Sequence, residues 1–348
     1  MTDRKKKAGY LIGVLLILVI SALAVWFVTS EDGLRETLED IREADGRWLA
    51  AGAGLLVLFV ALESVQMNML LKGMGYRMGY GKTLAVSNIG FFFSQITPGA
   101  TGGQPMQVVY LAALGVNALV GSLVVMLITI IYKLVLLLLF AFFMLVRHEA
   151  VFSAIADVKV FFSYGLTVQV GFLFFLILCV FRPLVVSRIL NTLITAGKKL
   201  HIIAEEDKWR KRIEESLTKY EEASSFLKAH PVVLLRMLLL TLCQRLAYFS
   251  ITWCVAKALG VQNCSWLGIT SIQVVLSLAV DLIPIPGTAG VNEYVFMDLQ
   301  DKMFGSDLVK AGVLLNRGIT FFLLLVITGL VTFGATLWLR LANKEGKK

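Results

Sequence analysis

Two short stretches rich in proline and glycine interrupt regions of the chain that are otherwise apolar. The first runs Thr97-Pro-Gly-Ala-Thr-Gly-Gly-Gln-Pro105 and the second runs Pro284-Ile-Pro-Gly-Thr-Ala-Gly-Val-Asn-Glu293. Proline removes a backbone donor and glycine disfavours the helix, so neither stretch can lie inside a continuous helix. Irregular backbone at membrane depth is tolerated only where protein or a water-filled cavity surrounds it. We therefore expect two broken helices whose breaks face a cavity.

The chemistry expected at these breaks is the binding of an anion, such as a lipid phosphate. Half-helices beginning near Gln104 and Val291 would present unpaired N–H groups and the positive ends of their dipoles. Glycines would let a headgroup approach the backbone closely, and hydroxyls, including that of Thr288, would add donors. The alternative is that the glycines only permit tight helix packing. The candidate headgroup-binding residues at the breaks are Ser94, Thr97, Pro98, Gly99, Thr101, Gly102, Gly103, Gln104, Pro286, Gly287, Gly290, Asn292 and Glu293.

Three basic residues inside apolar segments are expected to line the same anion path. Lys133 follows the first break, Arg317 follows the second at a comparable distance, and Arg245 lies near the middle of another apolar segment. A charged side chain within hydrocarbon is energetically unfavourable, so its presence points to a function. Arg245 and Arg317 are the stronger candidates, because nothing nearby lets their side chains extend easily to the membrane surface. Arg236 lies near a helix start, and its side chain is expected to reach that surface.

Three acids, Glu63, Asp281 and Glu293, are the natural counter-charges. Glu293 lies within the second break, so we expect it to pair with a cation or to cap the half-helix rather than to catalyse a reaction. Glu63 shares its segment with Gln66 and Asn68, and it could contact an amino-bearing headgroup or carry a proton. For each acid, a purely structural salt bridge is the alternative.

The remaining reactive side chains do not indicate an enzyme, a metal site or a cofactor. The cysteines lie in or beside apolar segments without metal-ligand spacing, and we expect buried, inert thiols. The histidines fall in loops or at helix ends, and no Ser/His/Asp pattern is present. Lys and Arg gather at the ends of apolar runs, so the net charge of +9 indicates orientation in a membrane rather than nucleic acid binding. These cysteines and histidines are Cys179, Cys243, Cys254, Cys264, His148, His201 and His230.

The composition predicts an all-α polytopic membrane protein. Of the 348 residues, 57% are hydrophobic and 16% are charged, which is less charge than globular chains carry. Runs of about 20 apolar residues are long enough to span hydrocarbon as helices. We expect two re-entrant hairpins of half-helices, at 83–117 and 265–305, and six full spans. The spans are expected at 9–29, which we take as a retained helix, and at 48–71, 118–146, 159–181, 231–259 and 311–340.

The distribution of charge predicts that both termini face the cytoplasm. Arg4-Lys-Lys-Lys7 precedes the first span, and basic residues follow the last one as far as Lys348. Basic loops stay on the cytoplasmic side of a membrane. The acid-rich loop from Glu31 to Asp45 is then outside, and the basic connector at 182–230 is inside. If both hairpins enter and leave on one side, all strongly basic segments fall on the same face.

The same path is a repeat with inverted topology. Span, polar connector, span, broken hairpin and span occur twice in that order, first from the inside and then from the outside. Residues 1–158 form the expected first half, and residues 159–348 form the second. Inverted repeats with broken helices at their interface are typical of transporters with a site at the membrane midplane. The alternative is a pair of ordinary Pro-Gly kinks in spanning helices.

The connector between Leu200 and Ala229 is predicted to contain an amphipathic helix. Apolar residues recur there at roughly helical spacing among many charges. We expect this helix to adsorb to the cytoplasmic membrane surface, and a docking site for a partner protein is the alternative. The apolar residues are Ile202, Ile203, Trp209, Ile213, Leu217, Tyr220 and Phe226.

The two breaks resemble motifs of a known family. Thr97–Pro105, with Gly115-Val116 after it, resembles the first motif of the lysylphosphatidylglycerol synthase transmembrane family. Pro284–Glu293 is similar to the second motif, and Asn316-Arg-Gly-Ile-Thr-Phe-Phe322 is similar to the Arg-led stretch that follows it. The resemblance covers about residues 9–340. It implies a protein of the bacterial-type cytoplasmic membrane that moves an aminoacylated or related phospholipid between leaflets, as in the flippase domain of the multiple peptide resistance factor.

Two positions depart from the family pattern. The family's first motif usually continues Gly-Gly-Glu-Pro with an arginine shortly after it, whereas Gln104 and Gln107 stand here. The change removes an acid–base pair that would suit a cationic lysyl headgroup.

The family's two-domain members also carry a soluble synthase domain. This chain ends at Lys348, soon after its last expected span, so we do not expect it to transfer lysine alone.

These observations lead to the hypothesis of a flippase-like lipid translocase without enzymatic activity of its own. The expected partners are membrane phospholipids, with a separate synthase or modifying enzyme and a second copy of the chain as further possibilities. One alternative is an accessory membrane subunit that recruits a lipid- or glycan-modifying enzyme through residues 182–230. Another is a protein related to the phosphatidylglycerol lysyltransferases, with a role in lipid metabolism and antibiotic resistance.

Overall fold

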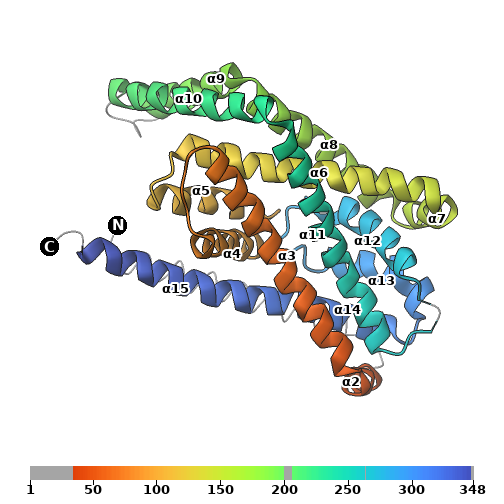
Figure 1. Ribbon diagram of the computed structural model, residues 1–348. Helices are drawn as coiled ribbons and strands as arrows, with labels where there is room; N and C mark the ends of the chain where they lie inside the picture. Colours follow the sequence, from red (N-terminus) through yellow and green to blue (C-terminus); the bar gives the residue numbers. More distant parts are fainter. Residues whose placement is uncertain (1–33, 200–205, 263, 346–348) are drawn as a thin grey trace.

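The protein is a multi-pass helical membrane protein (Figure 1). The computed structural model describes residues 34–199, 206–262 and 264–345, and every regular element in these ranges is a helix. Five helical segments are long and apolar enough to cross a membrane. They are α3 (Gly46–Gly73), α6 (Ala118–Val146), α8 (Lys159–Phe181), α11 (Pro231–Ala258) and Val309–Leu339. They match five of the expected spans, whereas the sixth, at 9–29, lies outside the described residues.

Helices α3 and α11 cross the centre of the molecule side by side (Figure 1). Both have 28 residues, and together they form the largest interface between two helices. A buried polar chain joins them: Gln66 Nε2 donates to Gln244 Oε1 at 3.1 Å, and Thr241 Oγ1 donates to Gln66 Oε1 at 2.8 Å. Hydrogen bonds between helices supply association energy where lipid removes the hydrophobic driving force.

Each proline- and glycine-rich stretch separates two half-helices that pack against each other. The first pair is α4 (Tyr80–Ile96) and α5 (Gly103–Ala113), and the second is α12 (Trp266–Val280) and α13 (Val291–Phe304). Gly90 of α4 faces Gln107 of α5, and Gly268 at the start of α12 faces Met303 at the end of α13. The chain therefore turns back on itself at each break.

The last apolar segment is not one regular helix. It consists of α14 (Val309–Arg317), a π-helical turn η1 (Gly318–Leu323) and α15 (Leu324–Glu345). A π-turn widens the helix and changes the pattern of carbonyl pairing, often at a functional site. Gln95 Nε2 of α4 donates to the carbonyl of Thr320 in this turn at 3.4 Å. The irregular turn is thus tied to the helix that leads into the first break.

Two short helices lie outside the predicted spans and hairpins, and the first of them replaces a predicted loop. Residues Leu34–Glu43 of the acid-rich segment form α2, and α7 (His148–Asp157) lies between α6 and α8. The side chain of Asp45 accepts from the Arg47 backbone N–H at 2.8 Å and so caps the start of α3. The acidic segment is therefore a structured end of the helix bundle rather than a loop.

The helical connector packs onto the rest of the protein, and its expected adsorption to the membrane surface stays a prediction. It forms α9 (Pro183–Lys199) and α10 (Glu206–Ala229), and α10 contacts α6 and α11. Tyr220 Oη donates to the carbonyl of Cys179, and Ser224 Oγ donates to that of Val180, both at 2.8 Å. The last carbonyls of a helix have no partner within it. Helix α10 therefore caps the end of α8.

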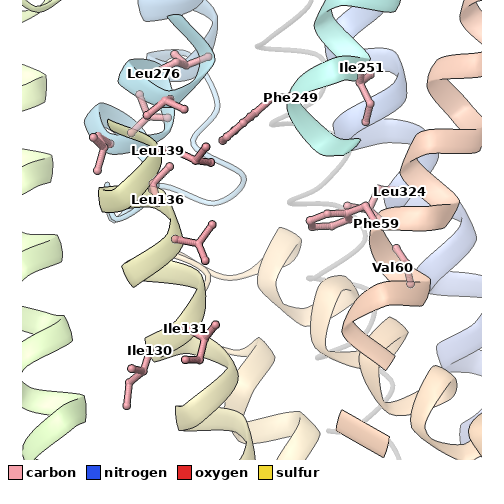
Figure 2. Close-up of a cluster of buried hydrophobic side chains, with 14 of the residues drawn as sticks. Phe59, Val60, Ile130, Ile131, Leu136, Leu139, Phe249, Ile251, Leu276 and Leu324 are labelled. Carbon is pink, nitrogen blue, oxygen red and sulfur yellow. The ribbon is translucent and has the colours of Figure 1, made fainter. Parts of the chain in front are cut away.

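The core is aliphatic and aromatic, and it is shared by helices from both expected halves. Three of the four cysteines are buried as expected, but Cys243 is exposed on α11, because its side of that helix faces outward. Figure 2 shows part of the core, to which α3, α6, α11, α12 and α15 contribute side chains. The labelled residues are Phe59, Val60, Ile130, Ile131, Leu136, Leu139, Phe249, Ile251, Leu276 and Leu324.

Candidate functional site

The two breaks adopt the same turn and meet at their tips. Pro98 and Pro286 pair as an isolated antiparallel β-bridge. In the first break, Thr101 N donates to the carbonyl of Pro98 at 3.3 Å, and in the second, Ala289 N donates to that of Pro286 at the same distance. In both, the following helix begins four residues after the glycine of the Pro-Gly pair. The repeat noticed in the sequence is thus also a repeat of backbone geometry.

Both turns hold a non-glycine residue in a left-handed conformation. The φ angles are +58° at Gly99 and +55° at Ala100, and +57° at Gly287 and +52° at Thr288. Two successive residues with positive φ are typical of a type I′ turn, which favours glycine or asparagine at both positions. A side chain in this region costs about 1–2 kcal/mol. Ala100 and Thr288 are therefore strained in equivalent positions, as residues near functional sites often are.

The glycines of the first break permit close packing, which supports the alternative given above for them. A Cβ added at Gly102 would collide with the side chain of Thr97, and one added at Gly103 would collide with Ser94 and the carbonyl of Gly90. Gly290 differs, because it has a φ of +82° and nothing lies within 4 Å of an added Cβ. Gly290 therefore leaves open space beside the backbone, which Gly102 and Gly103 do not.

A cavity of about 420 Å³ lies beside the two breaks. This volume falls in the range of small-molecule sites, which is about 300–1,000 Å³. Both breaks and the last apolar segment line it, together with residues of α3, α4, α5, α6, α8, α11, α12 and α13. Among the candidate residues, those that line it are Glu63, Ser94, Gly99, Thr101, Gly103, Gln104, Lys133, Arg245, Asp281, Gly287, Asn292 and Arg317, together with Thr288.

The other candidates shape the breaks instead of lining the cavity. Thr97 Oγ1 accepts from Gly102 N at 2.8 Å and donates to the carbonyl of Phe93 at 2.6 Å, so it holds the end of α4. Pro98 and Pro286 form the contact between the two turns. Gly290 and Glu293 form the start of α13. These residues position the cavity wall and do not reach its surface.

Glu293 and Arg317 form a buried ion pair that holds the second break. Glu293 Oε1 lies 2.7 Å from Arg317 Nε, and Glu293 Oε2 accepts from Gly290 N at 2.7 Å. Arg317 Nη2 donates to the carbonyl of Gly287 at 2.9 Å, and its guanidinium lies 4.5 Å from the ring centre of Phe321. Pairing with a cation and capping of the half-helix were expected as alternatives for Glu293, and it does both.

The pairing of Glu293 makes the two half-helix starts electrically different. At α13, the protein's own carboxylate already occupies the position that a bound anion would take. The first turn of α5 has no acid, and Gly103 and Gln104 there line the cavity. An N-terminus of this kind attracts negative charge. An anionic group in the cavity therefore meets an unneutralised helix end at α5 and not at α13.

Lys133 and Asp281 form a second pair across the cavity. Lys133 Nζ lies 3.8 Å from Asp281 Oδ2, and the hydroxyl of Tyr132 donates to the same carboxylate oxygen. The lysine is 4% exposed, and the aspartate is 23% exposed. A charge this deep needs a partner. The pair joins α6 to the end of α12, and so it connects the first half of the chain to the second.

Arg245, the third cation of the cavity, lies against the faces of aromatic rings. Its guanidinium carbon lies 4.1 Å from the ring centre of Tyr132, 4.8 Å from that of Phe59 and 5.7 Å from that of Tyr248. Aromatic faces attract cations within about 6 Å. Within the described residues, no carboxylate lies within 4.0 Å of Arg245. It is thus the cavity cation with no direct salt bridge there, and a ligand anion can neutralise it.

Glu63 faces the same space from α3. Gln107 Nε2 donates to Glu63 Oε1 at 2.9 Å, and both Glu63 and Arg245 line the cavity. The other departure from the family pattern, Gln104, donates to Thr129 Oγ1 at 2.9 Å. Both glutamines therefore bond to neighbouring helices, and the Gln107 amide supports the Glu63 carboxylate where the family pattern has a cation nearby.

Several cavity residues were not proposed from the sequence. Tyr132, Tyr248 and Thr320 line the cavity with Gln244. Two of them could have been proposed because they lie near candidate residues in the sequence: Tyr132 precedes Lys133, and Tyr248 lies three residues after Arg245. Side chains three residues apart share a helix face. The aromatic surroundings of Arg245 were readable in part, but Phe59 comes from a distant segment that nothing in the sequence connects to it.

Comparison with known proteins gives one family across most of the chain. The profile of the lysylphosphatidylglycerol synthase TM region matches residues 11–328. A UPF0104 membrane protein of Archaeoglobus fulgidus is 24% identical over 313 residues, which are 89% of this chain and 92% of that protein. A UPF0104 membrane protein of Pyrococcus horikoshii is 29% identical over 108 residues, which are 31% of this chain and 30% of that protein. The residues matched by the family profile include both breaks and all residues that line the central cavity.

Proposed function

Because the chain belongs to the lysylphosphatidylglycerol synthase transmembrane family, we propose that it is a flippase-like translocase that moves a phospholipid between leaflets. A headgroup enters the cavity beside the two breaks while the acyl chains stay in the lipid. The protein carries out no covalent step. It provides a polar path where the hydrocarbon would otherwise exclude a charged group.

One observation carries this proposal: the cavity lies among apolar helices but presents charges of both signs. Lys133, Arg245 and Arg317 supply positive charge, and Glu63 and Asp281 supply negative charge. A phosphate fits the start of α5, where Gly103 and Gln104 line the cavity, and the guanidinium of Arg245. An amino group fits the Glu63 carboxylate. The headgroup that matches this cavity best therefore carries both a phosphate and an amine, as aminoacylated phosphatidylglycerol does.

We further propose that the chain is built as an inverted repeat, with residues 1–158 and 159–348 as its halves. In this arrangement six spans and two re-entrant hairpins place both termini in the cytoplasm, in a bacterial-type cytoplasmic membrane. The equal lengths of α3 and α11 and the matching turns support it. The cavity then lies near the midplane, where transporters of this kind bind their substrates.

Reconstitution in liposomes tests the translocase proposal. The full chain is placed in phosphatidylcholine vesicles with fluorescent phosphatidylglycerol or its lysyl derivative, and a reductant that cannot cross the membrane reports how fast the inner label reaches the surface. We expect faster translocation than in empty vesicles. Arg245→Met is expected to lower the rate at least tenfold, because it removes the cavity cation without a direct salt bridge.

Arg236→Met is the matched control, since Arg236 is an exposed arginine on the same helix. It is expected to leave the rate unchanged. A rate equal to that of empty vesicles contradicts the proposal, and so does an equal effect of the two substitutions.

Cysteines at Thr101 and Asn292, which line the cavity, test the topology: charged thiol reagents should reach both. Gly99 and Gly287 are less suitable positions for such probes, because their positive φ angles disfavour a side chain.

A further inference from the structure

A second cavity lies on the outer surface of the protein, between α4, α5 and α15. These three helices run close together (Figure 1), and α4 packs along α15 and against α5. The cavity has a volume of about 320 Å³ and shares no lining residue with the central one. We call it the α4–α15 groove. Its lining residues include Gly81, Lys82, Tyr110, Gly334, Ala335 and Trp338.

The walls of the groove suit an apolar chain. Small residues keep it open: a Cβ added at Gly81 or Gly334 would meet nothing within 4 Å. The hydroxyl of Tyr110, a polar atom on the wall, is already hydrogen-bonded to Thr336 of α15. An occupant is therefore not required to supply a polar partner there. An acyl chain meets these conditions.

One end of the groove is cationic. Lys82 is exposed, and its Nζ lies 5.8 Å from the ring centre of Trp338, which is itself 51% exposed. Trp338 stands at the end of the apolar segment Val309–Leu339. Tryptophan and lysine gather where hydrocarbon meets headgroups. No side chain caps the start of α4, which begins beside Lys82 at Tyr80, so backbone N–H groups add to the positive charge there.

We infer that the α4–α15 groove binds an anionic phospholipid, with one acyl chain along the groove and the phosphate beside Lys82 and the start of α4. The apolar walls, the open glycines and the single cationic end together match one lipid molecule. This site is separate from the central cavity, and it does not depend on whether the protein translocates lipid.

Quenching of tryptophan fluorescence by brominated lipid tests this inference. The full chain is reconstituted in phosphatidylcholine vesicles that contain brominated phosphatidylglycerol or, at the same mole fraction, brominated phosphatidylcholine. The contribution of Trp338 is the difference between the wild type and Trp338→Phe. We expect the phosphatidylglycerol to quench Trp338 about fivefold more effectively, the preference that one lysine gives at an anionic surface. Lys82→Gln is expected to bring this ratio to about one.

Two controls separate the groove from ordinary surface lipid. Lys257→Gln alters a second lysine–tryptophan pair, in which Lys257 Nζ lies 5.9 Å from the ring centre of Trp253, and it should leave the ratio unchanged. Gly334→Leu fills the groove and should reduce quenching by both lipids, whereas Gly171→Leu, at another open and exposed glycine, should not.

Equal quenching by the two lipids in the wild type overturns the inference. A loss of preference in Lys82→Gln without any effect of Gly334→Leu also overturns it, because the charge would then act on surface lipid without the groove. Elution of each variant at the wild-type volume in size-exclusion chromatography confirms that the comparison is made between folded proteins.

Discussion

Replacing Glu293 or Arg317 tests whether the second break depends on its buried ion pair. Glu293 is 1% exposed, and its two carboxylate oxygens face Arg317 Nε and Gly290 N, each at 2.7 Å. Removing one partner of a buried pair costs about 3–5 kcal/mol, because the other charge stays buried without compensation. We expect Arg317→Met to lower the free energy of unfolding by this amount, and Glu293→Gln by about 3 kcal/mol.

The double variant should be less destabilised than the sum of the two changes. With both charges gone, neither is left uncompensated, so we expect a coupling energy of about 2 kcal/mol. Unfolding in mixed micelles of dodecyl maltoside and sodium dodecyl sulfate, followed by tryptophan fluorescence, measures each free energy. The exposed pair between Lys302 and Asp157, at 2.8 Å, serves as the control and should give less than about 1 kcal/mol. Additivity within about 0.5 kcal/mol at Glu293 and Arg317 refutes the reasoning.

Four further outcomes follow from single positions. Ala100→Gly should raise the free energy of unfolding by about 0.5–1 kcal/mol, because it relieves a positive φ angle. Gly165→Ala should lower it by about 2 kcal/mol, because the new Cβ would strike the backbone of α12. Tyr220→Phe should lower it by about 1 kcal/mol, because the carbonyl of Cys179 loses its donor. The same unfolding measurement checks all three. A membrane-permeant maleimide should label Cys243 of the folded protein and spare the three buried cysteines, as mass spectrometry of the labelled chain would show.

Much of the helix pattern was predictable because apolar length and charge determine membrane spans directly. The segments 118–146 and 159–181 agree with α6 and α8 at both ends. The half-helix starts were also placed within a residue of where they lie, since glycine and proline determine where a helix can begin. The cap that α10 forms on α8 was not predictable, because it depends on two hydroxyls meeting carbonyls about 40 residues away.

The charged residues of the central cavity could be predicted from the sequence, but the ion pairs that they form could not. Intramembrane Lys133, Arg245 and Arg317 were evident as candidates because charged residues are rare in apolar runs. Which acid pairs with which cation depends on how six helices pack against one another. The spacing of residues along the sequence does not determine that packing. The π-turn after Arg317 was also absent from the pattern, and so was the contact of its Thr320 carbonyl with Gln95, which lies more than 200 residues away.

The contact between Pro98 and Pro286 has a mechanical consequence. The two hairpins touch at their tips, and the ion pair of Lys133 with Asp281 ties α6, the helix that follows the first hairpin, to the residue that ends α12. A displacement of either hairpin must therefore carry the other with it or break this contact.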